Sequence, residues 1–147
     1  MDFKEEAKTK LRRFDAMKTA LINLTEEIHR LENEYTAIRS TRTDGNHVSG
    51  GTSAREDALI NNIVERKELE HALENAKAWV RIVDRALKCL SPEDKKILHR
   101  LYIYPEKGAP KRLCEELGIE SSSIYRRRNK ALHRFTIAVY GIGADSL

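Results

Sequence analysis

The stretch KRLCEELGIESSSIYRRRNKAL, residues 111–132, decides how the C-terminal part of the chain folds. Gly118 marks the end of a short helix, because glycine enters left-handed backbone space without a side-chain penalty. Leu113 precedes it and Ile124 follows it, at spacings that let two flanking helices share one apolar centre. Cys114 is small where those helices would cross, which permits close approach. The spacing predicts a helix-turn-helix.

The second helix of this unit is predicted to run from about Ser121 to Tyr140. In a helix-turn-helix this helix enters the major groove of DNA by its N-terminal end. Short hydroxyl side chains and free backbone N–H groups at that end can bond phosphates or base edges. No acid occurs in residues 121–135, whereas Arg126, Arg127, Arg128, Lys130 and Arg134 follow the serines.

The sequence therefore predicts a surface that binds double-stranded DNA. The serines approach the groove, Arg126, Arg127 and Lys130 meet the phosphates, and Arg126 also reaches a guanine edge. Tyr125 and Asn129 lie near the same exposed face, where they can read a thymine methyl group or an adenine. The predicted DNA-binding residues are Lys111, Arg112, Ser121, Ser122, Ser123, Tyr125, Arg126, Arg127, Asn129 and Lys130.

Arg127 and Arg128 depart from the usual pattern, because many helix-turn-helix units place an apolar residue three or four positions after the β-branched one. Two outcomes are open. Either an arginine stem covers the edge of the core with its head in water, or the recognition helix packs loosely.

Residues 1–90 carry the pattern of a long antiparallel coiled-coil helical hairpin. Apolar residues recur every three or four positions from Phe14 to Ile38 and again from Leu69 to Leu90, although Arg66 falls on the seam. The glycine-rich residues 41–53 predict a loop between the two helices. Ser53 and Glu56 form a capping signature for the second helix.

A helical head is predicted for residues 91–141, with a tail at 142–147. Ser91, Pro92 and Asp94 are a strong helix start, since they supply an N-cap, a proline at the first position and an acid three residues after the cap. This helix is expected to reach about Ile103. The predicted fold class is all-α, a hairpin followed by a small helix-turn-helix domain.

Composition narrows the possible functions. Charged residues make up 34% of the chain and the net charge is +4, which suits solvated helices and an acidic partner. No apolar run spans a membrane and the first residues are charged, so we expect a cytoplasmic protein without a membrane partner. Cys89 and Cys114 form no CxxC pair and are expected in the core. No metal or cofactor is predicted, and no P-loop, GxSxG or HExxH motif suggests an enzyme.

The C-terminal part resembles region four of bacterial sigma factors. LSPEDKKILHRLY, residues 90–102, looks like the opening helix of that region, and residues 112–135 look like its helix-turn-helix and following helix. A helical arm that ends in such a unit resembles phage-encoded regulators of the ArpU and RinA kind. The resemblance implies a sequence-specific transcriptional regulator in a bacterial host cell, with RNA polymerase as a further partner.

We expect the helical hairpin to form a homodimer, so that two heads read two half-sites. Two alternatives stay open. One is a phage DNA-packaging protein similar to a small terminase subunit, although that family usually places its DNA-binding unit first. The other is a protein-interaction adaptor whose head binds a protein and no DNA.

Overall fold

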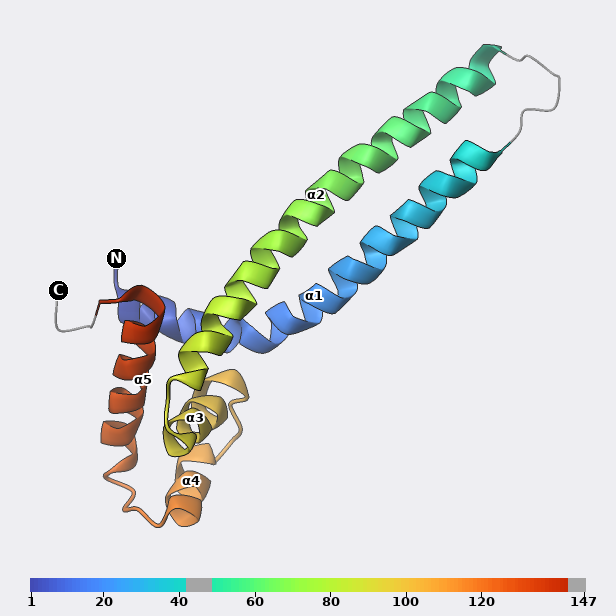
Figure 1. Ribbon diagram of the computed structural model, residues 1–147. Coiled ribbons are helices and arrows are strands. Elements are labelled where there is room, and N and C mark those ends of the chain that lie inside the picture. Colours follow the sequence, from blue (N-terminus) through green and yellow to red (C-terminus); the bar gives the residue numbers. More distant parts are fainter. Residues whose placement is uncertain (42–48, 143–147) are drawn as a thin grey trace. The chain divides into compact units, whose positions relative to one another are not determined.

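The computed structural model describes the backbone of residues 1–41 and 49–142, and the side chains of 1–41 and 53–142. Its elements are α1 (Phe3–Ser40), α2 (Ser49–Lys88), α3 (Pro92–Leu98), the π-helical turn η1 (His99–Ile103), α4 (Ala109–Leu117) and α5 (Ile124–Tyr140) (Figure 1). All regular structure in these ranges is helical. The predicted all-α class, a hairpin followed by a small helical head, is confirmed.

The chain forms two compact units. The head comprises Met1–Met17 and Ala78–Leu147, and the arm comprises Lys18–Lys77. The predicted boundary at residue 90 followed the sequence pattern, whereas the compact units divide both long helices. The first turns of α1 and the last turns of α2 belong to the head, because their apolar side chains complete its core.

The arm consists of α1 and α2 in antiparallel pairing. The Nε atom of Arg55 donates to the Ile38 carbonyl at 3.2 Å, and Nδ2 of Asn62 donates to the Leu31 carbonyl at 2.9 Å. Residue numbers thus decrease along α1 where they increase along α2, as antiparallel pairing requires. Ile28, Leu31 and Ala76 are buried, while the other seam residues of the arm are half-buried. The predicted apolar seam is present.

A buried polar group interrupts the seam of the arm. Asn62 is only 4% exposed, and its Oδ1 accepts a bond from Nε of Arg66 at 2.8 Å. The Arg66 guanidinium lies over the Tyr35 ring, 4.9 Å from its centroid. Arg66 on the seam is thus partnered on both sides. Buried polar side chains of this kind fix the register of paired helices at some cost in stability.

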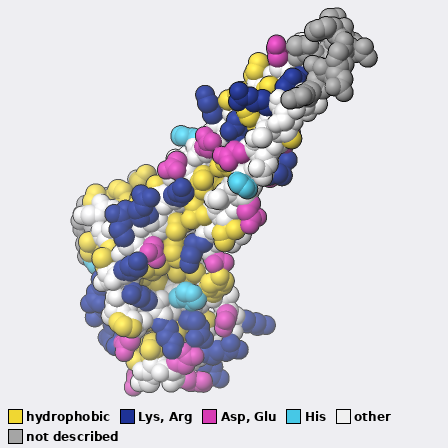
Figure 2. All heavy atoms as spheres, turned by 45° about the vertical axis from the view of Figure 1, so that its right-hand side comes forward, with side chains coloured by type: hydrophobic (Ala, Val, Ile, Leu, Met, Phe, Trp, Pro, Cys, Tyr) yellow, Lys and Arg dark blue, Asp and Glu magenta, His cyan; other side chains and the backbone are white. Residues whose placement is uncertain are grey.

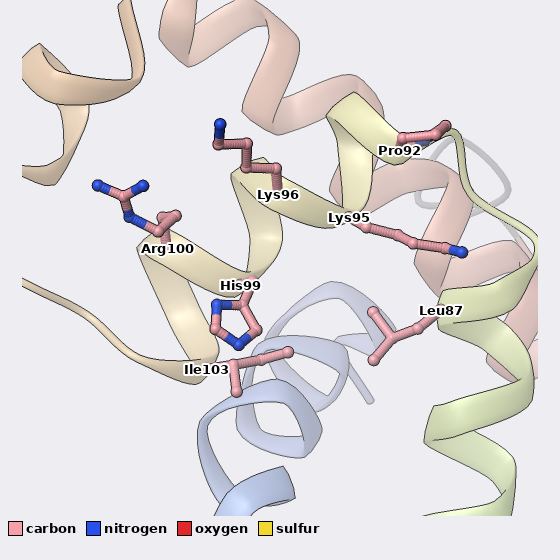
Figure 3. Close-up of a pocket in the computed structure, with 7 residues that line it drawn as sticks. All are labelled: Leu87, Pro92, Lys95, Lys96, His99, Arg100 and Ile103. Atoms are coloured by element: carbon pink, nitrogen blue, oxygen red, sulfur yellow. The ribbon is translucent and has the colours of Figure 1, made fainter. Parts of the chain in front are cut away.

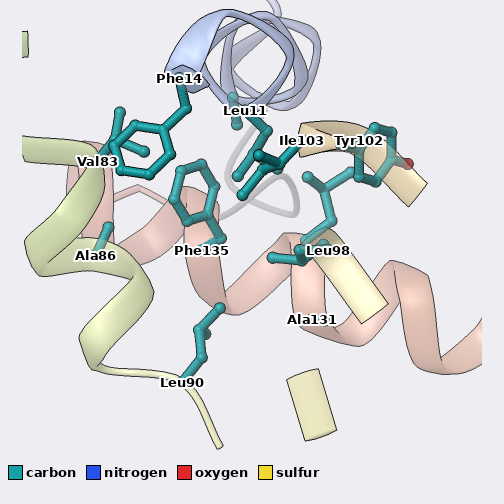
Figure 4. Close-up of a cluster of buried hydrophobic side chains, with 12 residues drawn as sticks. Leu11, Phe14, Val83, Ala86, Leu90, Leu98, Tyr102, Ile103, Ala131 and Phe135 are labelled. Carbon is teal, nitrogen blue, oxygen red and sulfur yellow. The ribbon is translucent and has the colours of Figure 1, made fainter. Parts of the chain in front are cut away.

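The head is built around a cluster of apolar side chains from α1, α2, α3, η1 and α5 (Figure 4). Phe135 of α5 lies at its centre and is fully buried, with Phe14 from α1 and Val83 from α2 beside it. Leu98 and Tyr102 close the cluster from the side of α3 and η1. Four stretches of the chain, α1, α2, α3 with η1, and α5, are held together by this one apolar centre.

Several local predictions need correction. The backbone of residues 49–53 is helical, so α2 begins before the capping signature at Ser53; a long helix tolerates the roughly 1 kcal/mol cost of each glycine. Residues 42–48 of the predicted loop, and 143–147 of the predicted tail, lie outside the described residues. Cys89 is exposed rather than buried, because it follows the last turn of α2.

The helix predicted at residues 92–103 starts as expected, with the Ser91 side chain accepting the Asp94 N–H at 3.2 Å. Its second half is the π-helical turn η1, closed by the Tyr104 N–H on the His99 carbonyl at 2.8 Å. The wider turn was missed because its residues carry an ordinary helical pattern.

Replacing Phe135 with alanine should lower the free energy of unfolding by about 3–5 kcal/mol, because it empties the centre of the head cluster. Ile137→Ala is the matched control: it lies two residues away on α5 but is 43% exposed, and it should change stability by about 0.5 kcal/mol or less. Urea unfolding followed by circular dichroism measures both. Equal effects of the two variants would contradict the assigned packing.

Candidate nucleic-acid interface

The residues for which a helix-turn-helix was predicted fold as α4, a turn at Gly118 and α5. Gly118 has φ 66° and ψ 34°, and its N–H bonds the Cys114 carbonyl. The Ile119 N–H also bonds that carbonyl, at 3.1 Å. Beneath the turn, Leu113 and Ile124 are buried with Ile97 from α3 and Cys114. The residues that predicted the motif therefore do converge on one small apolar cluster.

The three serines form a turn ahead of α5. The Ser123 N–H bonds the Glu120 carbonyl at 2.9 Å, and α5 begins at Ile124 rather than near Ser121. Serines compete with helix formation through local bonds, which explains the later start. Ser121 and Ser122 are exposed, Ser123 is half-buried, and the Ser123 side chain caps no N–H. Ser121 and Ser122 are therefore the exposed hydroxyl-bearing residues at this end.

The outer face of α5 carries Tyr125, Arg126, Asn129 and Lys130, all of them exposed. Burial of Ile124 and Ala131 on the inner face determines this orientation, since side chains advance about 100° per residue around a helix. Arg126 and Lys130 stand four residues apart and make no ion pair with any residue in the described ranges. Arg128 of α5 also lacks an acidic partner among the described residues, but it is half-buried, so Arg126 and Lys130 are the exposed cations of α5 without an ion pair.

Other predicted contacts are already engaged within the head. Arg127 is half-buried and donates to Oε2 of Glu93 on α3 at 2.8 Å. Arg112 is exposed but pairs with Glu106 at 3.2 Å. Arg134, which was not among the predicted contacts and lies about two turns after Arg127 on α5, donates to Oδ2 of Asp94 at 2.8 Å. Lys111 is exposed at the start of α4 without an ion pair to a described residue.

Arg127 and Arg128 both keep their stems at the edge of the core. Arg128 is half-buried; its guanidinium lies 5.1 Å from the Tyr125 ring centroid and donates to Oδ1 of Asn129 at 3.3 Å. The apolar residues that follow, Ala131, Leu132 and Phe135, are fully buried. The half-burial of both arginines agrees with the covering stem. Their heads bond Glu93 and Asn129, and the Arg127 side chain is still 40% exposed.

A groove that sequence reasoning missed lies beside α3. It encloses about 380 Å³ and is lined by Leu87, Pro92, Lys95, Lys96, His99, Arg100 and Ile103. Figure 3 shows Leu87 of α2 facing His99 and Ile103 across it. Its lining is mainly apolar, with basic side chains along the rim. The groove forms between residues of α2, α3 and η1, so no local sequence pattern predicts it.

The basic rim is partly neutralised from α4. Glu116 bonds Lys96 at 2.8 Å and Arg100 at 3.1 Å. The bond from Lys96, and to a lesser extent that from Arg100, lowers the pKa of the Glu116 carboxyl below its ordinary value. Lys95 makes no ion pair with a described residue. Figure 2 shows this mixture of basic and acidic side chains over the end of the head that holds α3 and α4.

Among the described residues, no group of three His, Cys, Asp or Glu side chains is placed to hold a metal ion. None of the described helices has an apolar stretch sufficient to cross a membrane.

Residues 37–136 match the family DUF1492, described as a protein of unknown function. The match spans more than half of the 147 residues and includes all of α2, the residues that line the groove, α4 and most of α5. The chain belongs to this family. No curated protein and no solved structure matches it.

Gly118→Ala should destabilise the head by about 1–2 kcal/mol, the cost of placing a side chain in left-handed backbone space. No atom lies within 4 Å of an added Cβ, so a steric clash contributes nothing. Gly118→Asn should cost less, since asparagine tolerates this conformation. Urea midpoints of the two variants test the order; an alanine variant as stable as the wild type would contradict the assigned turn.

Proposed function

We propose that this protein is a sequence-specific, double-stranded DNA-binding transcriptional regulator. The observation that carries the proposal is the outer face of α5, where Arg126 and Lys130 stand exposed and unpaired behind the accessible Ser121 and Ser122. Helix-turn-helix proteins insert this end of the second helix into the major groove. The resemblance of residues 90–102 and 112–135 to sigma region four supports the same function.

The predicted contacts differ in whether they are already engaged: Arg112 and Arg127 form ion pairs within the head, and we assign the DNA contacts to the exposed residues without such pairs. Ser121, Ser122, Tyr125, Arg126, Asn129 and Lys130 form the surface offered to the groove. Arg126 is the candidate for a guanine edge, and Asn129 for an adenine. Lys111 stands at the start of α4 as a phosphate contact.

Replacing Arg126 or Lys130 with alanine should flatten the salt dependence of DNA binding. Each lost phosphate contact lowers the slope of log K against log salt by about 1. Genomic fragments selected by the wild-type protein supply the duplex, and fluorescence anisotropy across a salt series measures the slope. Lys67→Ala, which removes an exposed arm cation, is the control and should leave the slope unchanged. Wild-type affinity that does not fall with salt would refute DNA binding.

A second observation, the groove beside α3, supports binding to a protein partner. The groove beside α3 offers an apolar floor with Lys95, Lys96 and Arg100 at its rim. We propose that it receives a partner segment in which acidic residues flank an apolar side chain, because that chemistry complements both parts of the lining. RNA polymerase is the partner that the sigma-like resemblance suggests.

Lys95→Glu should weaken binding to purified polymerase of the source bacterium by about three- to tenfold, since it reverses the unpaired charge at the rim. Biolayer interferometry measures the affinity, and Lys67→Glu in the arm is the charge-matched control. Identical loss in both variants, or no polymerase binding by the wild type, would exclude this contact. Polymerase binding without DNA binding would favour the adaptor.

We further propose that the protein is a homodimer through the arm. Many seam residues there remain half-buried, among them Leu21, Leu24, Leu69 and Leu73, which leaves apolar surface for a second pair of helices. Light scattering distinguishes the assemblies: a dimer agrees with a two-headed regulator, whereas a ring of many copies would favour the DNA-packaging alternative.

A further inference from the structure

A small polar pocket lies between α3 and α5, next to the proposed DNA-binding face. It encloses about 210 Å³ and is lined by Ser91, Glu93, Asp94, Arg127, Lys130 and Arg134. Since water occupies about 30 Å³ per molecule in the liquid, the pocket has room for a phosphate group together with some solvent. Its three cations come from one side of α5, at residues three and four apart.

The two acids of the pocket are held differently. Asp94 has a side chain only 11% exposed, and its bond to Arg134 is part of the contact between α3 and α5. Glu93 is 58% exposed, and its partner Arg127 is 40% exposed. Lys130 has no ion pair with a described residue. The carboxylate of one pair is thus enclosed by the fold, although its partner Arg134 is 62% exposed, whereas both side chains of the other pair lie open to solvent beside an unpaired cation.

An exposed ion pair of this kind is weak. Such a pair shifts an equilibrium by a factor of about five or less. A phosphate group offers arginine a charge-assisted, bidentate acceptor, and its binding to a duplex also releases counterions. A backbone phosphate at this position would therefore displace Glu93 from Arg127 more readily than it would separate Asp94 from Arg134.

We propose that Arg127, Lys130 and Arg134, with the Ser91 hydroxyl, form a binding site for one phosphate group, and that Glu93 is an internal competitor that occupies Arg127 in the free protein. The proposal rests on the proposed function in taking the DNA backbone as the source of the phosphate. Glu93 then limits non-specific affinity, because every bound phosphate must first replace it. Asp94 keeps Arg134 in place whether or not DNA is bound.

Removing the competitor should strengthen DNA binding. Glu93→Gln is expected to tighten binding about three- to tenfold at low salt and to steepen the slope of log K against log salt. The melting temperature should stay close to that of the wild type, since the lost pair is exposed. Glu116→Gln is the control, because it removes the same charge from a similarly exposed acid of the head that lies outside this pocket.

A double variant tests whether the effect passes through Arg127. In an Arg127→Ala background, Glu93→Gln should change DNA affinity no more than Glu116→Gln does. An equal gain from Glu93→Gln in both backgrounds, or an equal gain from Glu93→Gln and Glu116→Gln, would overturn the competitor and leave only a general effect of net charge.

A second arm uses inorganic phosphate, added at constant ionic strength, with the arginine Nε–Hε signals followed by NMR. The Arg127 signal should shift with phosphate, and further in Glu93→Gln. A shift without DNA binding would keep the phosphate site, assign it to a free phosphate compound and refute the proposed function. DNA binding by the wild type, with no Arg127 shift and no gain in Glu93→Gln, would overturn the site and leave the function standing.

Discussion

The inner face of α5 is the constraint on which the head depends. Ile124 closes the small cluster of α3 and α4, whereas Ala131, Leu132 and Phe135 enter the larger cluster. A single helix therefore belongs to both apolar centres and fixes them relative to each other. Once these four side chains are buried, the helical period leaves Arg126 and Lys130 no direction but outward. The exposure of Arg126 and Lys130 follows from the packing of the opposite face of α5.

The seven residues of α3 likewise contribute to two different surfaces. Asp94 and Leu98 face α5, while Lys95 and Lys96 line the groove on the other side. Because side chains advance about 100° per residue, one short helix serves both surfaces. Under the proposed function, DNA and a protein partner approach opposite sides of α3. Neither would block the other, so a ternary complex is compatible with the head as it is built.

Much of the fold could be predicted from the sequence because it depends on local rules. Heptad spacing predicted the long helices, Ser91-Pro92 predicted the start of α3, and Gly118 predicted the turn. Predictions failed where the structure of a residue depends on contacts that its neighbours along the chain do not indicate. Asn62 is an ordinary polar residue in sequence, yet it is buried by its position opposite Leu31. The late start of α5 depends on the bond between Ser123 and Glu120, which competes with an earlier helical turn.

The candidate site shows the limit of counting charges. Five cations without an acid between residues 121 and 135 predicted a strongly basic helix. The acids that pair with two of them, Glu93 and Asp94, lie 34 and 40 residues earlier. The sequence places these acids at the start of a helix, and they do lie in the first turn of α3. Their carboxylates nevertheless face α5, because buried Leu98 and Phe135 bring the two helices together. The number of unpaired cations on α5 is therefore set by the packing of α3 as much as by the number of arginines in α5.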